Sequence, residues 1–300
     1  MKLSRRTFFK VSAVGATTAA GVQPAEAALA LGAAPHAKGV LVDTTRCIGC
    51  RACEAACAEA NQLAGRPERP GDDGVFEKRR TTDEFTLTVV NRFEHKSLRA
   101  ESPVRFIKTQ CMHCVDPACA SACPARALEK TAAGPVTYTG NRCLGCRYCM
   151  VSCPFDVPKF EYSKAVPYVR KCSFCADRQA RGLQPACTEV CPSGALTFGR
   201  RADLLEEARI RIYQHPDDYV HHIYGEHEAG GTSWLYISDV EPEHLGLKTG
   251  VDDMARPRLA QTALGAVPMV MTLWPPILMG LYALRNRTAS GEAAKEDHHG

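Results

Sequence analysis

Sixteen cysteines in four sets of four constrain this 300-residue chain more than any other feature. The first and third sets share the spacing C-x₂-C-x₂-C-x₃-C, and the second reads C-x₂-C-x₄-C-x₃-C. In the last set, eleven residues separate the second and third cysteines. The sets are Cys47, Cys50, Cys53 and Cys57; Cys111, Cys114, Cys119 and Cys123; Cys143, Cys146, Cys149 and Cys153; and Cys172, Cys175, Cys187 and Cys191. Packing does not require so many thiols, so we expect them to bind something.

The shared spacing, when proline follows it, is typical of bacterial ferredoxins, whose thiolates hold [4Fe–4S] clusters. Proline follows three of the sets, as Pro124, Pro154 and Pro192, whereas Ala58 follows the first. Three thiolates on one tight loop can reach three irons of one cube, while the fourth thiolate points to the other cluster of a pair. The sequence therefore predicts four [4Fe–4S] clusters.

Two kinds of internal repeat support this interpretation. The segments DTTRCIGC (43–50) and TGNRCLGC (139–146) each place a glycine inside the cysteine loop, where the backbone must turn closely. The segments CPARAL (123–128) and CPSGAL (191–196) each leave the ligand region, and we expect a short helical turn there. Duplication of one ferredoxin unit explains both repeats.

Zinc sites and disulfides are the competing interpretations. Structural zinc uses isolated C-x₂-C pairs and needs no third cysteine two residues later. Disulfides suit an exported protein, but cysteines in such a tight loop pair awkwardly. One set holding a [3Fe–4S] cluster or zinc is also conceivable, although no cysteine is missing. Spacing alone leaves two pairings of the sets open: the second with the third and the first with the last, or sequential pairs.

The two ends of the chain indicate export and a membrane anchor. Residues 1–27 combine MKLSRRTFFK, a short apolar run and an Ala-Glu-Ala cleavage site, which is typical of a twin-arginine signal peptide. Residues 259–284 contain no charged residue and are long enough to span a bilayer as one helix, despite three prolines. We expect a linker at 241–258 and a short cytoplasmic tail at 285–300.

The remaining sequence predicts a mixed α+β protein. Residues 85–90, 101–110 and 234–240 have the pattern of strands, and 203–212 that of a short amphipathic helix with Asp203 as N-cap. The polar stretch 61–80 is expected at the surface. A net charge of +4 does not suggest nucleic-acid binding, and no phosphate loop or nucleophile motif is present. Surface or core roles are expected for His113, His221, His222 and His227.

Four stretches of the chain resemble a known family. They are RCIGCRACEAACAEAN (46–61), CMHCVDPACASACPARAL (111–128), NRCLGCRYCMVSCPFDVPKFEY (141–162) and HIYGEHEAGGTSWLYISDV (222–240). The chain resembles the four-cluster iron–sulfur electron-transfer subunits of bacterial membrane oxidoreductases, most of all those of the hydrogenase-2 type. Related subunits serve formate dehydrogenase-N and the dimethyl sulfoxide and polysulfide reductases.

This resemblance implies an electron-transfer domain at 38–240 built from two pseudo-symmetric ferredoxin-like modules. Module A comprises about 38–60 plus 165–200, and module B about 104–164. The resemblance also implies crossed pairing of the cysteine sets. The ligands implied are Cys47, Cys50, Cys53 and Cys191 for cluster 1; Cys57, Cys172, Cys175 and Cys187 for cluster 2; Cys111, Cys114, Cys119 and Cys153 for cluster 3; and Cys123, Cys143, Cys146 and Cys149 for cluster 4.

In function, the resemblance implies a non-catalytic subunit on the periplasmic side of the inner membrane. It would relay electrons between a catalytic subunit and a membrane quinone-reactive subunit. A [NiFe] hydrogenase is the favoured catalytic partner, and a molybdopterin oxidoreductase is the alternative. A zinc- or disulfide-stapled interaction protein is the remote alternative.

Cations near the ligands are expected to raise the potentials of clusters that carry about −2 charge when oxidised. Seven basic residues lie close to ligands in the sequence: Arg46, Arg51, Lys108, Arg142, Arg147, Arg170 and Lys171. The alternative for each is an ordinary solvated charge. The resemblance singles out Lys159 as the cation between clusters.

Overall fold

The computed structural model describes residues 34–63, 73–95 and 103–296, so the expected signal peptide at 1–27 lies outside the described residues. A three-stranded sheet in the order β8-β1-β9 forms the centre. Its strands are β1 (Lys38–Asp43), β8 (Leu196–Arg200) and β9 (Trp234–Ile237). β8 runs antiparallel to β1, with Val42 opposite Leu196, whereas β9 runs parallel to β1. Residues from both ends of the electron-transfer domain therefore share one sheet.

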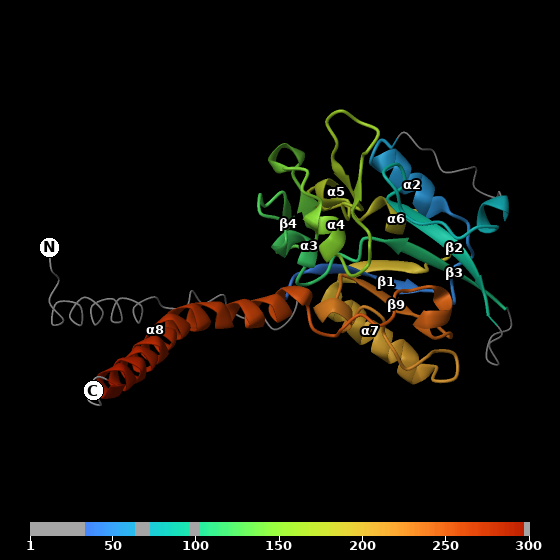
Figure 1. The fold of residues 1–300 in the computed structure, drawn as a ribbon. Helices are drawn as coiled ribbons and strands as arrows, with labels where there is room; N and C mark the ends of the chain where they lie inside the picture. Colours follow the sequence, from blue (N-terminus) through green and yellow to red (C-terminus); the bar gives the residue numbers. More distant parts are fainter. Residues whose placement is uncertain (1–33, 64–72, 96–102, 297–300) are drawn as a thin grey trace.

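Alternation along β1 divides the core between two layers. Val40 and Val42 face a cluster that contains Trp234 and Tyr236, whereas Leu41 faces the helix α7 (Arg201–Gln214) on the other side. Since successive side chains of a strand point to opposite faces, one buried strand serves both layers. Figure 1 shows α7 against the sheet and away from the cysteine-bearing elements.

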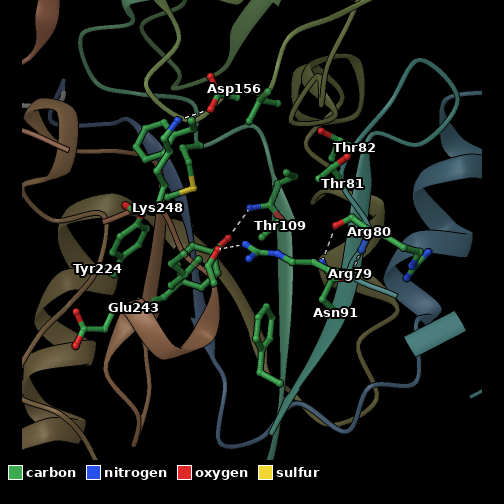
Figure 2. Close-up of a pocket in the computed structure, with 18 of the residues that line it drawn as sticks. Arg79, Arg80, Thr81, Thr82, Asn91, Thr109, Asp156, Tyr224, Glu243 and Lys248 are labelled. Atoms are coloured by element: carbon green, nitrogen blue, oxygen red, sulfur yellow. Dashed lines mark hydrogen bonds and ion pairs between the residues drawn. The ribbon is translucent and has the colours of Figure 1, made fainter. Parts of the chain in front are cut away.

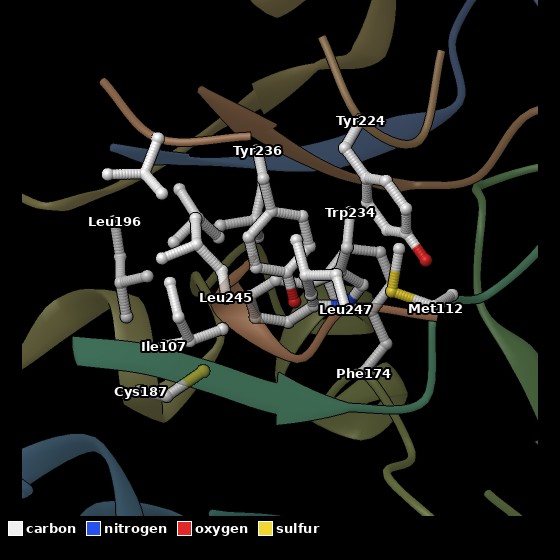
Figure 3. Packing of buried hydrophobic residues seen from close by; sticks show 13 residues of the cluster. Ile107, Met112, Phe174, Cys187, Leu196, Tyr224, Trp234, Tyr236, Leu245 and Leu247 are labelled. Carbon is white, nitrogen blue, oxygen red and sulfur yellow. The ribbon is translucent and has the colours of Figure 1, made fainter. Parts of the chain in front are cut away.

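A second ribbon, β2 (Thr88–Glu94) with β3 (Val104–Gln110), packs beside the central sheet. Ile107 of β3 belongs to the same apolar cluster as Trp234 and Tyr236, and Figure 3 shows both aromatic side chains pointing from β9 toward β3. The expected strands at 85–90, 101–110 and 234–240 are thus present with shifted ends.

The cysteine-bearing elements form two matching arrangements. In one, β1 pairs with β8 and α2 (Ala52–Ala60) packs against α6 (Ala186–Glu189). In the other, β4 (Leu128–Lys130) pairs with β5 (Val136–Tyr138) and α3 (Ala118–Ser121) packs against α4 (Tyr148–Ser152). This mixed helix-and-strand arrangement confirms the α+β prediction.

The remaining elements are short. The hairpin β6 (Lys159–Phe160) with β7 (Val169–Arg170) follows α4, and α5 (Ala176–Ala180) lies in the wide gap of the last cysteine set. The 3₁₀ turns are η1 (Asp73–Phe76), η2 (Gly140–Arg142), η3 (Glu228–Gly230) and η4 (Pro242–Leu245). In the expected surface stretch 61–80, residues 64–72 lie outside the described residues, and Val75 is buried.

Two local predictions were wrong. Asp203 does not cap α7: the N-cap is Arg200, whose guanidinium binds the Asp203 carboxylate with nitrogen–oxygen distances of 2.7 Å. The segments after Cys123 and Cys191 are turns with left-handed residues, Arg126 and Gly194, that lead into strands rather than short helical turns. Helix α7 begins at Arg201, two residues before the expected start, and the turns after the cysteines are each closed by an i→i+3 hydrogen bond, from Arg126 N to Cys123 O at 3.1 Å and from Gly194 N to Cys191 O at 3.4 Å.

The C-terminal part forms one long helix, α8 (Arg256–Glu296), which projects from the body in Figure 1. It runs through the expected anchor at 259–284 and includes Pro268, Pro275 and Pro276. Apolar side chains along it are exposed, Met271 at 70% and Tyr282 at 68% for example. Within the described residues, however, no helix combines the length and apolar character needed to cross a membrane, so the expected spanning helix is not found.

Candidate functional site

The cysteine loops begin with backbone turns that only certain residues adopt readily. Gly49 and Gly145 have positive φ angles of 71° and 68°, as the expected tight turns require. Two residues later, Arg51 and Arg147 are also left-handed and precede α2 and α4. The first and third sets therefore have the same backbone, which aims three thiols into one space.

The first group of thiols lines a cavity beneath β1 and β8. Cys47, Cys50 and Cys53 lie on the first loop, and Cys191 lies just before the turn that leads into β8. Pairing of β1 with β8 sets the end of one strand beside the start of the other, which brings Cys191 to a loop far away in sequence.

The second group joins α2, α6 and the loop after β7. The helices α2 and α6 pack together and carry Cys57 and Cys187. Burial raises the pKa of Cys57 to about 12, with smaller contributions from the nearby thiols of Cys187 and Cys175. Burial also raises the pKa of Cys172, with Cys57 as the next cause. These four thiols therefore lie close together.

The third group has a corresponding composition. Burial raises the pKa of Cys114, and the neighbouring thiols of Cys111, Cys153 and Cys119 add to this effect. Three of these cysteines belong to the second set, and Cys153 ends the third set. Helix α3 contains Cys119 and helix α4 is followed directly by Cys153, and the packing of these helices holds the two cysteines near each other.

The fourth group surrounds a cavity beside β4 and β5. Its lining includes Cys123, Cys143, Cys146 and Cys149. Burial raises the pKa of Cys149 to about 11, with smaller contributions from the other three thiols. Cys146 is the one exposed cysteine among those described, so this group reaches the surface.

Cys47, Cys50, Cys53 and Cys191 thus line one cavity, and Cys123, Cys143, Cys146 and Cys149 line another, while the assignment of all sixteen cysteines to four clusters stays a prediction. In the described part of the chain, no three His, Cys, Asp or Glu side chains converge on a position for a single metal ion. Backbone N–H groups instead point at thiols: Ala127 N lies 3.2 Å from Cys123 Sγ and Phe174 N lies 3.3 Å from Cys172 Sγ. Thiol ligands with N–H donors around them fit [4Fe–4S] clusters.

The groups are also neighbours in a fixed order. Burial is the main cause of the raised pKa of Cys53, and the thiol of Cys187 adds to it. Cys187 belongs to the second group, so the first and second groups are neighbours. For Cys172 the thiols that add to the effect of burial include Cys111 of the third group. For Cys119, whose pKa is raised to about 12, they include Cys149 of the fourth. One line of thiols therefore runs from the first group to the last.

The basic residues singled out from the sequence divide into buried and solvated ones. Arg51, Lys108 and Lys171 are buried, whereas Arg46, Arg142 and Arg147 are exposed and Arg170 is half-buried. Lys130 of β4, which was not singled out from the sequence, lies near Cys114, and burial lowers its pKa to about 8. Its position two residues after buried Leu128 placed it on the inner face of a strand.

Lys159 lies in a different place from the one that the resemblance suggested. It helps to line a cavity of about 410 Å³ between the β2–β3 ribbon and the segment that contains Glu243 and Lys248 (Figure 2). In the described part of the chain, Lys108 rather than Lys159 lines the cavity of the first cysteine group. A buried lysine beside the first cysteine group is thus on β3, before the second set.

The histidines have structural surroundings. His113 is fully buried and stacks on Phe174 with ring centroids 4.9 Å apart, while its Nδ1 accepts a hydrogen bond from Val136 N. His222 Nε2 lies 2.8 Å from a carboxylate oxygen of Glu228. The expectation of core or surface roles agrees with these contacts.

Comparisons with known proteins agree with the geometry. A domain family described as a 4Fe-4S dicluster domain matches residues 103–201. The chain is 34% identical to the hydrogenase-2 operon protein HybA of Escherichia coli O157:H7, covering 99% of this chain and 98% of that protein. It is 36% identical to the nitrate-inducible formate dehydrogenase iron-sulfur subunit of Escherichia coli K12, over 66% of each chain.

A further relative, from Nitratidesulfovibrio vulgaris, is 47% identical over 95% of this chain and 78% of its own. The full-length similarity to the hydrogenase-2 operon protein and the thiol groups described above lead to the same conclusion. The chain belongs to the ferredoxin-like [4Fe–4S] electron-transfer subunits of the hydrogenase-2 and formate dehydrogenase type.

Proposed function

We propose that this chain holds four [4Fe–4S] clusters and carries electrons through them one at a time. Each cluster takes three thiolates from one cysteine set and one from another. The ligands are Cys47, Cys50, Cys53 and Cys191 (cluster 1); Cys57, Cys172, Cys175 and Cys187 (cluster 2); Cys111, Cys114, Cys119 and Cys153 (cluster 3); and Cys123, Cys143, Cys146 and Cys149 (cluster 4). The grouping of these thiols in the structure supports the assignment.

The observation that carries this function is the continuous line of thiols. Cys53 packs in one cluster with Cys187, Cys111 in one with Cys172, and Cys119 in one with Cys149, which orders the groups from first to fourth. A line with two ends suits a relay between two partners. The chain's own residues then act as ligands and as an insulating, structured medium, and the cysteines carry out no bond chemistry on a substrate.

The attachment of α8 suggests which end faces which partner. At the start of α8, Arg256 donates a hydrogen bond of 3.1 Å to the Ser152 carbonyl of α4, and Arg258 lies 3.6 Å from the Asp116 carboxylate beside α3. The helix therefore begins next to the third and fourth groups. We place the membrane quinone-reactive subunit at the exposed fourth group and the catalytic subunit at the first.

The catalytic partner is proposed from the relatives. A relative named for the hydrogenase-2 operon matches over almost the whole chain, whereas the formate dehydrogenase subunits match over about two thirds of it. We therefore favour a [NiFe] hydrogenase, with a molybdopterin oxidoreductase as the alternative. Purification from solubilised membranes, with mass spectrometry of the attached catalytic subunit, decides between them.

Export by the twin-arginine route, a periplasmic location and attachment through residues 259–284 complete the proposal. The uncharged stretch between Arg258 and Arg285, and its exposed apolar side chains in α8, support attachment to the membrane or to a membrane subunit. Truncation before Leu259 should release a soluble protein that retains its clusters. If the truncated chain still sediments with membranes that lack its partner subunits, the attachment is elsewhere.

The cluster proposal is tested on the full-length chain. We expect about sixteen irons and sixteen sulfides per chain, broad visible absorption and reduction in one-electron steps. A colourless protein that contains zinc, or one whose cysteines are oxidised to disulfides, would contradict the proposal and support the stapled interaction protein instead.

A further inference from the structure

Lys108 on β3 is a lysine buried between two cysteine groups. Its side chain is 2% exposed, and it lines the same cavity as Cys47, Cys53 and Cys191. Lysine is almost never fully buried unless it is paired. The groups that compensate the positive charge of Lys108 therefore indicate its role.

The Lys108 ammonium has a partner for each of its three N–H groups. Nζ donates hydrogen bonds of 2.8 Å to Thr88 Oγ1 and of 2.8 Å to Gln110 Oε1. It also lies 4.4 Å from the centroid of the Trp234 ring, within the range of a cation–π interaction. Three partners of this kind match a protonated amine.

The two oxygen acceptors are oriented toward Lys108 by further bonds. The Thr88 hydroxyl donates its own hydrogen to the Thr109 carbonyl, at 3.1 Å, so its oxygen accepts from the lysine. Gln110 Nε2 donates to Tyr236 Oη at 2.8 Å, which leaves the amide oxygen for the lysine. Tyr236 in turn donates to the Lys108 carbonyl at 2.9 Å. The network therefore holds the ammonium in one position.

None of these partners carries a negative charge. Among the described residues, no carboxylate forms an ion pair with Lys108, whereas buried Arg51, at the same cavity, lies 3.3 Å from the Glu54 carboxylate. A buried charge without compensation is costly. The compensation for Lys108 must come from the cysteine thiolates.

Those thiolates belong to two groups. Trp234, over which the Lys108 ammonium lies, packs in one cluster with Cys53 of the first group and Cys187 of the second. Burial raises the pKa of the surrounding thiols, and in each case Lys108 acts in the opposite direction. The thiols are those of Cys47, Cys53, Cys57, Cys172 and Cys175. The first two are proposed ligands of cluster 1 and the other three of cluster 2, so one cation interacts with both.

We propose that Lys108 is a fixed buried positive charge shared by clusters 1 and 2, and that it raises the reduction potentials of both. Reduction adds a negative charge to a cluster, and a nearby cation stabilises the reduced form. The low dielectric of the interior strengthens the effect. This inference rests on the proposed function, and the experiment below separates the two.

The test uses redox titrations, followed by electron paramagnetic resonance, of the full-length cluster-loaded chain and of its Lys108→Met variant. We expect two of four reduction steps to move to lower potential. At a fixed solution potential, the oxidised-to-reduced ratio of these clusters should rise at least tenfold, which equals about 59 mV for one electron. Lys108→Arg, which keeps the charge, should leave the steps closer to the wild type.

Lys130→Met is the matched control. Lys130 is half-buried and hydrogen-bonded to carbonyls, those of His113 and Gly134, but it lies beside Cys114 of the third group. Its removal should move a different step. The proposal is overturned if Lys108→Met or Lys130→Met shifts all reduction steps equally. It is also overturned if Lys108→Arg and Lys108→Met shift the steps equally, or if Lys108→Met shifts none of them at full iron content.

Iron content is measured for the wild type and for every variant, because a wild-type chain with fewer than four clusters would contradict the proposed function rather than the role of Lys108. If Lys108→Met fails to assemble, Gln110→Glu decides the question. This variant keeps the lysine and the side-chain size, yet adds a negative charge beside the ammonium. The same two steps should move to lower potential, and unchanged potentials would reject the role of Lys108.

Discussion

The first and the third cysteine sets have the same spacing and nearly the same backbone, yet their surroundings differ. Around the first, Arg51 is 2% exposed and bound to Glu54, and the cavity contains Lys108. Around the third, Arg147 is exposed and lies 5.8 Å from the rings of Phe160 and Tyr162.

The two cavities are also lined by corresponding residues in the segment that begins with the proline after a cysteine. Pro192, Ala195 and Leu196 line the first, and Pro124, Ala127 and Leu128 line the other. What differs is the β2–β3 ribbon, which covers the first cavity and supplies Lys108. A repeated motif thus produces a repeated ligand loop, whereas the neighbouring elements determine its charge and its access to solvent.

Loss of a thiolate should have the largest effect and should differ between the two loops. Cys191→Ser and Cys146→Ser should each remove one cluster, about four of about sixteen irons. Cys191 links the end of β1 to the start of β8, so its loss should also lower the melting temperature, whereas loss of exposed Cys146 should change it little. Iron analysis and circular dichroism measure both effects, and equal melting temperatures would show that the link contributes nothing.

The second prediction concerns the buried ion pair of Arg51 with Glu54, which the third cysteine set lacks within the described residues. Glu54 accepts hydrogen bonds from Arg80 at 2.6 Å and from Val90 N at 2.5 Å, besides its contact with Arg51. Glu54→Gln should remove the negative charge that faces Arg80 and buried Arg51 and cost about 3–5 kcal/mol, because removal of one partner of a buried ion pair is strongly destabilising. Arg147→Gln should cost less than about 1 kcal/mol, since its ring contacts are exposed. Denaturant unfolding of both variants gives the comparison, and similar losses would refute it.

The two loop glycines differ in the space around them. A Cβ at Gly49 would lie 2.5 Å from the Phe106 ring, whereas at Gly145 the nearest atom, on Phe160, would be 3.7 Å away. Gly145→Ala should therefore cost only the left-handed strain, about 1–2 kcal/mol. Gly49→Ala should cost about 1–3 kcal/mol more through overpacking. Phe106→Leu should recover part of the Gly49→Ala loss in thermal unfolding, and failure to do so would exclude the clash as its cause.

Near the third cysteine set, Glu161 is a buried carboxylate like Glu54, but its partners Lys164 and Arg170 are in contact with solvent. Glu161 accepts hydrogen bonds from Lys164, Arg170 and Tyr168 N at 2.7, 2.6 and 3.1 Å. Burial alone would raise the pKa of Glu161, but these bonds hold it below its usual value. The stabilisation is therefore complete above the unfolded pKa of about 4.3 and is lost as the pH falls through the lower folded value.

Glu161→Gln should cost about 1–2 kcal/mol at neutral pH and less in acid, because the wild type then loses the same interaction. Unfolding measured between neutral pH and about pH 3 tests the sign. A variant whose deficit grows as the pH falls would contradict the assigned protonation state.

Local features of the fold followed well from the sequence, and distant ones less well. The helix at 203–212 was expected from its periodicity, but its N-cap was not, because Arg200 binds Asp203. Strand ends shifted by a few residues, as β2 begins at Thr88 rather than at 85. The wide gap in the last set contains α5, and Arg178 of that helix closes it through Gln184 O and Glu189.

For the site, the ligand type, the four sets and the tight glycine turns could be predicted from the sequence, because spacing of two or three residues dictates loop geometry. The tertiary fold established which sets share a cavity, through the pairing of β1 with β8 and of α2 with α6. It also decided that Lys108 rather than Lys159 lies among the thiols. Burial and charge compensation depend on residues far apart in the chain, and no local pattern records them.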